Sequence, residues 1–228
     1  QYAQLSDVLD LQAFDPVLSE FSENFGEAMG NSLDQVVRTV VAAGTTVQYA
    51  STAGSRVAVG SGMDFTSAEI REAVNTLKRS NAKPVIDGKF VCIIHPDTSR
   101  DMFADTSVVN AFLYAAPRDD RNPLFTGVLG DYMGVRFVET TNALISSSAG
   151  LSGADVYHAL FIGKEAYGVT ELDAMQARLI VHPRGSGGHT DPLEQYGTVG
   201  WKAALAAVVL NQNFMCRVEH NTSRSRAA

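Results

Sequence analysis

The sequence contains little of what marks the most easily recognised protein classes. It has two cysteines among 228 residues, too few for a disulfide framework. Cys92 and Cys216 both lie in apolar runs, so we predict buried free thiols, with a disulfide or a shared metal ion as the alternative. No stretch approaches the roughly eighteen apolar residues that a membrane helix needs, so no membrane span is predicted.

Basic residues are outnumbered as well. The chain has 18 Lys and Arg against 25 Asp and Glu, for a net charge of −7. This balance argues against a coat protein that grips nucleic-acid phosphates with a basic face. It is compatible with a protein next to packed DNA, because an acidic wall would not stick to the DNA. With 45% hydrophobic and 19% charged residues, the chain reads as an ordinary globular protein of one or two domains.

The sequence opens at Gln1, without an initiator methionine or the pattern of a signal peptide. We therefore expect that an N-terminal piece has been removed or lies outside this sequence. Residues 1–14 mix apolar and acidic side chains and are predicted to form a short docking segment.

The stretch from Asp15 to Gly44 is predicted to be one long amphipathic helix around which the rest of the chain is organised. Asp15 and Pro16 are typical of a helix start, and Gly44 is typical of a helix end. Apolar residues recur every three or four positions, at Leu18, Phe21, Phe25, Met29, Leu33, Val36/Val37 and Val40/Val41. At about 1.5 Å per residue the helix spans roughly 40 Å, too long for one small core to cover. The alternative is a long surface helix of an α+β domain.

The remaining chain mixes strands and shorter helices, which favours an α+β fold. Residues Thr66–Glu69 form a capping box that opens a second helix, which ends before Pro84. Phe90–Ile94 is an apolar run typical of a strand covered on both faces. Further strands are predicted at 45–49, 56–59, 135–139, 156–162 and 177–181, a helix at 107–116, a helical turn at 164–167, and loops at 117–123, 140–155 and 185–190.

The last element, Thr198–His220, carries two signals. The alanines at 203–207 favour a helix by propensity. Phe214, Cys216 and Val218 alternate with other residue types, which is the period of a strand. We favour one long strand.

Glycine-rich and serine-rich stretches do not predict a catalytic or nucleotide site. Residues 127–130 (GVLG) and 185–188 (GSGG) lack the Lys-Ser/Thr of a phosphate loop and the spacing of a dinucleotide-binding motif, so we predict turns. Ser146–Ser148 lacks the nucleophile elbow of the α/β-hydrolases. Asp119 and Asp120 lie between arginines, where solvated charge is more common than acid–base chemistry.

The histidines are scattered. His95 and His182 each precede a proline, and with Asp97 or Asp191 they supply the ligand types of a metal site. The clustered spacing of a metal motif is absent, and His189 adds none, so structural roles are favoured. The sequence therefore predicts no catalytic residue, no cofactor-binding residue, no metal site and no enzyme.

Several motifs together resemble one family. They are Asp87-Gly88 leading to FVCIIHP at 90–96, Leu124-Phe125 followed by Gly127, Gly130 and GVRFVET at 134–140, GKEAYG at 163–168, DPL at 191–193, GWK at 200–202 and VLN at 209–211. This order resembles the phage N-four-type family of tailed-phage major capsid proteins. The similarity extends from about Val47 to Glu219.

The resemblance implies the Hong Kong 97-type capsid fold. The long helix, at 15–43, would be the spine helix of a peripheral domain that covers residues 1–79. Residues 80–191 would form the axial domain, and residues 192–228 would supply the return strand of the peripheral domain and a C-terminal tail. The N-terminal arm and extended loop of that family, which clasp neighbouring subunits, have no evident counterpart before Leu5.

The resemblance also implies a function. The chain would assemble with copies of itself, as hexamers and pentamers, into an icosahedral virion shell that encloses double-stranded DNA without reading its sequence. Assembly would take place in the bacterial host cytoplasm, with portal, scaffold or decoration proteins as further partners and no membrane. The alternatives are an encapsulin-like nanocompartment shell and, from a different class, a soluble α/β enzyme or ligand-binding domain.

Overall fold

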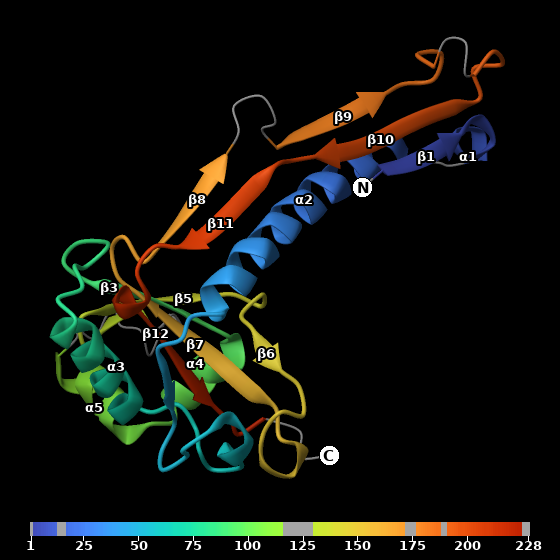
Figure 1. Cartoon of the computed structure of the whole chain (residues 1–228). Coiled ribbons are helices and arrows are strands. Elements are labelled where there is room, and N and C mark those ends of the chain that lie inside the picture. The colour runs from blue at the N-terminus through green and yellow to red at the C-terminus, as the bar shows by residue number, and fades with distance from the viewer. Residues whose placement is uncertain (1, 13–16, 116–129, 172–176, 188–190, 225–228) are drawn as a thin grey trace. The chain divides into compact units, whose positions relative to one another are not determined.

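The computed structural model of the chain describes residues 2–12, 17–115, 130–171, 177–187 and 191–224. Contacts between residues divide the chain into two compact units. The first unit contains residues 1–37 and 169–207, and the second contains residues 38–168 and 208–228. Figure 1 labels the helices and strands of both.

Helix α2 (Val17–Ala42) is the longest element, with 26 residues, and confirms the long helix predicted from the apolar spacing. Its predicted start at residues 15 and 16 lies outside the described residues. The Gly44 N–H donates to the Val41 carbonyl and closes the last turn, as the glycine stop predicts. One position of the predicted apolar face is wrong, because Val36 is 48% exposed.

The first unit packs part of α2 on a small antiparallel sheet. Strands β1 (Tyr2–Ser6) and β9 (Arg178–His182) pair with opposite edges of β10 (Tyr196–Lys202). Leu5, Phe25 and Val199 form the buried centre between sheet and helix. The segment predicted at 1–14 is therefore β1 followed by helix α1 (Asp7–Gln12).

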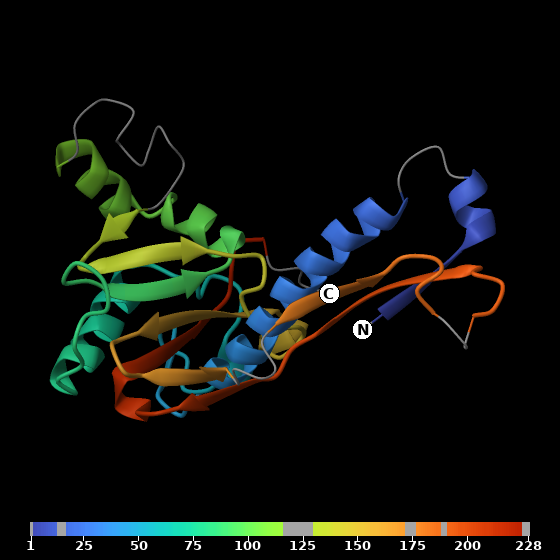
Figure 2. The same cartoon turned by 90° about the horizontal axis from the view of Figure 1, so that it is seen from above.

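The second unit is built on a seven-stranded mixed sheet with the order β2-β12-β7-β3-β5-β4, and β6 also pairs with β7. Figure 2 shows β5, β3 and β7 side by side. The strands are β2 (Val47–Tyr49), β3 (Phe90–Ile94), β4 (Asp131–Tyr132), β5 (Val135–Glu139), β6 (Ile145–Ser146), β7 (Val156–Ile162) and β12 (Met215–His220). The unit also holds α3 (Ser67–Arg79), α4 (Pro96–Met102) and α5 (Thr106–Ala115). A separate two-stranded sheet pairs β8 (Tyr167–Glu171) with β11 (Leu205–Val209).

Strand β7 lies at the centre of the seven-stranded sheet, and each of its seven residues is buried. Phe161 of β7 is in register with Cys92 on one side and with Cys216 on the other. Both cysteines are free and buried, as predicted. Burial raises the pKa of the Cys216 thiol to about 12, which keeps it protonated and unreactive at neutral pH.

Several local predictions are confirmed. Thr66 and Glu69 form the capping box of α3, and Ile70 and Leu77 on one face of α3 are fully buried. The strands predicted at 90–94, 135–139 and 156–162 have the predicted bounds. Gly185 has a positive φ, in keeping with the predicted turn, whereas the loop at 117–123 lies outside the described residues.

Three predictions for short segments are wrong. Residues Arg56–Ala58 form a 3₁₀ turn rather than a strand, closed by the Ala58 N–H on the Ser55 carbonyl while the Arg56 side chain reaches Glu219. The helical turn predicted at 164–167 is a non-helical turn at residues 164 and 165, because Glu165 has a φ of +63°. The loop predicted at 140–155 contains β6 and a short 3₁₀ turn.

The segment predicted as one long strand at 198–220 is three strands. β10 and β11 are separated at residues 203–204, and a 3₁₀ turn at Gln212–Phe214 separates β11 from β12. The second interruption has one local and one distant cause. Locally, the Asn211 side chain accepts from the Asn213 N–H, and at long range the Gln212 side chain accepts from the Thr45 N–H. Strand, rather than helix, is nevertheless the state of the alanine-rich part.

The division into units falls elsewhere than the predicted domain boundaries. Residues 38–79 and 208–220, predicted to be peripheral, share one unit with residues 80–168. The reason is burial: Leu77 of α3 and Val218 of β12 belong to the same apolar core as Ile94 of β3. The names peripheral and axial remain predictions.

Candidate functional site

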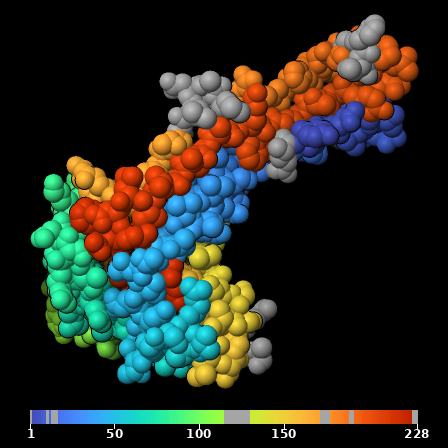
Figure 3. Space-filling view, viewed as in Figure 1, coloured from blue at the N-terminus to red at the C-terminus, as the bar shows by residue number. Residues whose placement is uncertain are grey.

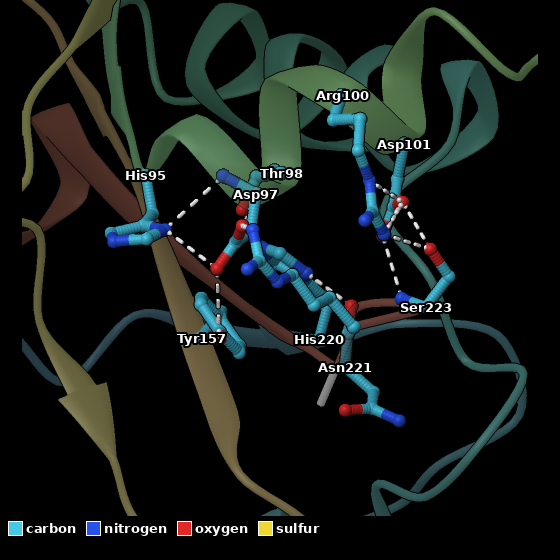
Figure 4. Close-up of polar contacts among 10 residues, drawn as sticks. His95, Asp97, Thr98, Arg100, Asp101, Tyr157, His220, Asn221 and Ser223 are labelled. Atoms are coloured by element: carbon cyan, nitrogen blue, oxygen red, sulfur yellow. Dashed lines mark hydrogen bonds and ion pairs between the residues drawn. The ribbon is translucent and has the colours of Figure 1, made fainter. Parts of the chain in front are cut away.

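A polar cluster lies in the second unit where β3 ends, α4 begins and β12 ends (Figure 4). His95 caps α4, because its Nδ1 accepts from the Asp97 N–H at 3.1 Å. The Asp97 Oδ2 atom accepts from the Tyr157 hydroxyl at 3.2 Å and lies 3.3 Å from His95 Nδ1. Arg224, near the end of the described chain, lies 3.7 Å from Asp97 Oδ1. Asp97 thus connects β7, α4 and the C-terminal segment.

His220 is the buried centre of this cluster. Its Nδ1 lies 2.7 Å from the Asn221 carbonyl oxygen, which can only accept, so Nδ1 carries the proton. Its Nε2 then accepts from the Thr98 hydroxyl at 3.4 Å. Burial lowers the pKa of His220 to about 4. The imidazole is therefore neutral at neutral pH, and it packs against Phe65 with ring centroids 5.0 Å apart.

The segment after β12 is fastened to α4 by a second set of contacts (Figure 4). Asp101, which is 9% exposed, accepts from the backbone N–H of Ser223 at 2.7 Å and from its hydroxyl. Arg100 pairs with Asp101 at 3.0 Å and also donates to the Ser223 hydroxyl. These contacts give the chain a defined position beyond its last strand.

A buried carboxylate on β12 forms an adjacent network. Glu219 is fully buried and accepts two hydrogen bonds from the Arg56 guanidinium, at 2.6 and 2.8 Å. Arg217 Nε lies 2.9 Å from the same carboxylate. Burial by itself would raise the pKa of Glu219, but the hydrogen bonds from Arg56 and the neighbouring positive charges lower it. The ionised carboxylate thus joins β12 to the turn at residues 56–58.

Ser146, His158 and Glu219 are the residue types of a catalytic triad, but their geometry and protonation do not support its chemistry. The Ser146 hydroxyl lies 2.8 Å from His158 Nε2, but His158 Nδ1 is 3.7 Å from Glu219 Oε1, too far for a hydrogen bond. Burial lowers the pKa of His158 to about 4, so the imidazole is a weak base. The three residues connect β6, β7 and β12.

Two other candidate residues, His182 and Asp191, belong to the first unit. His182 lies on β9 of the first unit, where Asp191 accepts from the Gln195 and Tyr196 N–H groups and orders a turn. Among the described residues, no three His, Cys, Asp or Glu side chains gather as metal ligands would. The described helices include none long and apolar enough to cross a membrane. His189, Asp119 and Asp120 lie outside the described residues.

The surface offers a second kind of candidate site, because large apolar side chains are exposed in both units. The most exposed are Tyr114 (88%), Tyr2 (78%), Leu193 (74%), Val57 (68%) and Leu210 (61%). Tyr114 and Leu113 (49%) are neighbours on α5. Side chains of this kind offer apolar surface that another protein could cover.

Comparison with known families shows to which family the chain belongs. Residues 3–170, about three quarters of the chain, match the model of the family described as phage capsid protein. The chain belongs to the phage capsid protein family. The predicted capsid function is thereby confirmed, and the polar clusters around His220 and Glu219 are the internal fastening of a capsid subunit. No curated protein matches this capsid protein.

Solved structures agree on the fold. The capsid protein is similar to the cyanophage Pam1 capsid asymmetric unit, with a TM-score of 0.73 and 16% identity over 98% of this chain and 74% of the other. It is similar to the capsid of Ralstonia phage GP4, with a TM-score of 0.72 and 13% identity over 97% and 73%. An encapsulin complex from Synechococcus elongatus matches with a TM-score of 0.60 and 6% identity over 98% and 73%. The predicted Hong Kong 97-type capsid fold is confirmed.

Proposed function

We propose that this capsid protein is the shell-forming subunit of a tailed phage of the N-four type. Copies of the chain associate into hexamers and pentamers, and these close into an icosahedral shell around double-stranded DNA. The observation that carries the proposal is the family match over residues 3–170. The order of motifs from Asp87 to Asn211 supports the finer assignment to the N-four type.

The surface chemistry of the subunit supports association with copies of itself. Leu113 and Tyr114 on α5, like Tyr2 and Leu193, leave apolar surface exposed to water. Contact with neighbouring copies would remove that surface from water and stabilise the assembly. Head-to-tail contacts use different patches on each copy and therefore suit rings of both five and six. The net charge of −7 supports enclosure of DNA without tight binding to it.

The proposal includes the division of labour between domains. Residues 1–79, together with the return strand in residues 192–228, would act as the peripheral domain, with α2 as its spine helix. Residues 80–191, which contain β3, β5 and β7, would act as the axial domain. Portal, scaffold and decoration proteins would be further partners, assembly would occur in the host cytoplasm, and the subunit would have no catalytic role.

Expression in a bacterial host tests the proposal. Sedimentation in a density gradient followed by negative-stain microscopy should show ring-shaped capsomers or closed particles. A chain that remains a monodisperse monomer over a wide concentration range would contradict the proposal.

The encapsulin similarity supports one alternative, a nanocompartment shell of the same fold. The contents of purified particles separate the two. Nuclease-protected DNA in particles recovered from infected cells supports the phage shell, whereas a co-purifying enzyme in particles without DNA supports the nanocompartment.

A further inference from the structure

Charge is distributed unequally along the chain. Residues 1–37 and 169–207 contain eleven acidic and three basic residues, a net charge of −8. Residues 38–168 and 208–228 contain fourteen acidic and fifteen basic residues, a net charge of +1. The whole excess of negative charge therefore lies in the first unit, and residues 1–37 contain no base at all.

The acidic residues of α2 form a stripe on its exposed side. Glu20, Glu23 and Glu27 follow at spacings of three and four residues, which places them on one face. All three are exposed, and none forms an ion pair with any described residue. Like charges at this spacing repel one another, so a cationic partner would stabilise the helix.

The outer face of α3 has the opposite character. Arg71 and Lys78 are exposed and likewise lack an ion pair within the described part of the chain. They border a groove of about 780 Å³, which Ala68, Asn75 and Met133 also line. Glu72 also lines this groove, so the charged residues of the groove, Arg71, Lys78 and Glu72, have a net charge of +1. Figure 3 shows part of the surfaces of α2 (blue) and α3 (teal) uncovered by other segments.

The two faces carry charges of opposite sign at the same spacing along each helix. Glu20 and Glu27 are seven residues apart, as are Arg71 and Lys78, which corresponds to about 10 Å along each helix. In an antiparallel arrangement Glu20 would face Lys78, Glu27 would face Arg71, and Glu23 would accept from the Asn75 amide.

We propose that the acidic stripe of α2 in one subunit docks on the α3 groove of a second copy. The inference rests on the proposed function, since it names one contact through which copies associate head to tail. The second copy is the occupant because the family assembles capsids, and because its own α2 supplies the complementary charge at the matching spacing. The stripe belongs to the first unit and the groove to the second, so each copy has one of each to offer and the contact can continue around a ring.

Charge-reversal variants of the full chain test the contact. Variant A is Glu20→Lys/Glu27→Lys and variant B is Arg71→Glu/Lys78→Glu. Each would place like charges together, and we expect the fraction of chain in capsomers, measured by sedimentation velocity at about 50 mM salt, to fall at least about tenfold. A mixture of A and B restores opposite charges at each contact between unlike chains, so assembly should return to within about threefold of the wild type.

The matched control is Glu165→Lys/Glu194→Lys, which changes the net charge as much as variant A at exposed positions outside α2 and α3. It should assemble like the wild type, and circular dichroism should show that every variant is folded. If variants A and B assemble as well as the wild type, the docking contact is wrong and the proposed function still stands. The same conclusion follows if both variants are impaired and their mixture does not restore assembly. If variant B assembles normally but loses retention of duplex DNA, the groove binds phosphate instead and the proposal is wrong. A wild-type chain that never assembles counts against the proposed function itself.

Discussion

Mild acid should destabilise the second unit through His158 and His220. Both imidazoles are buried, and burial lowers the pKa of each from an ordinary 6.5 to about 4. Between these values the unfolded chain binds a proton that the folded chain excludes, so stability falls as the pH drops through this window. A shift of about 2.5 units corresponds to about 3 kcal/mol for each histidine, of which about 2 kcal/mol is lost between pH 7 and pH 5.

Urea unfolding at pH 7 and pH 5 measures this loss. Hydrogen exchange followed by mass spectrometry on peptides from β7 and β12 assigns it to the second unit, where we expect a total decrease of about 4 kcal/mol. His158→Gln and His220→Gln should each reduce the difference between the two pH values by about 2 kcal/mol, whatever they do to stability at pH 7. His182→Gln, on β9 of the first unit, is the control and should leave the loss of protection in β7 and β12 unchanged. The reasoning is refuted if the two buried-site variants keep the whole wild-type difference.

Three further substitutions test the fastening of the second unit. Glu219→Gln should lower the free energy of unfolding by about 3–5 kcal/mol in urea titrations, because Arg56 and Arg217 lose their buried counter-charge. Thr66→Ala removes the capping box of α3 and should cost about 1 kcal/mol in the same titrations; no loss would show that the cap adds nothing. Gly150→Ala should lower the melting temperature, because its new methyl group would collide with the Val59 carbonyl oxygen. Gly26→Ala in α2 meets no atom within 4 Å and should instead raise stability by about 1 kcal/mol.

The sequence predicts best those elements whose signal is local. The spacing of apolar residues predicts α2, and the unbroken apolar run at 90–94 predicts β3, because both signals lie in neighbouring residues. The largely apolar segment 156–162 predicts β7 in the same local way. The capping box at Thr66 is local in the same way. Together these elements are enough for an α+β fold, and the resemblance over dispersed motifs supplies the capsid architecture.

The wrong predictions arise where a distant contact decides the local structure. Arg56 lies in a segment of strand composition, but its side chain pairs with Glu219, 163 positions later. The turn before β12 is fixed in part by Gln212, which reaches Thr45. No window of the sequence contains both partners of such a pair. The polar clusters around His220 and Glu219 are not predicted for the same reason, although the strand predicted up to His220 contains both residues.

The position of β12 has a consequence for synthesis of the subunit. This strand lies between β2 and β7, whose last residues, 49 and 162, come 166 and 53 positions before the first residue of β12 at 215. Until the ribosome has made residues 215–220, both neighbours have an unpaired edge inside what will become the sheet. A prematurely terminated chain therefore cannot complete its core, and such chains are left to proteases and chaperones before they can enter a shell.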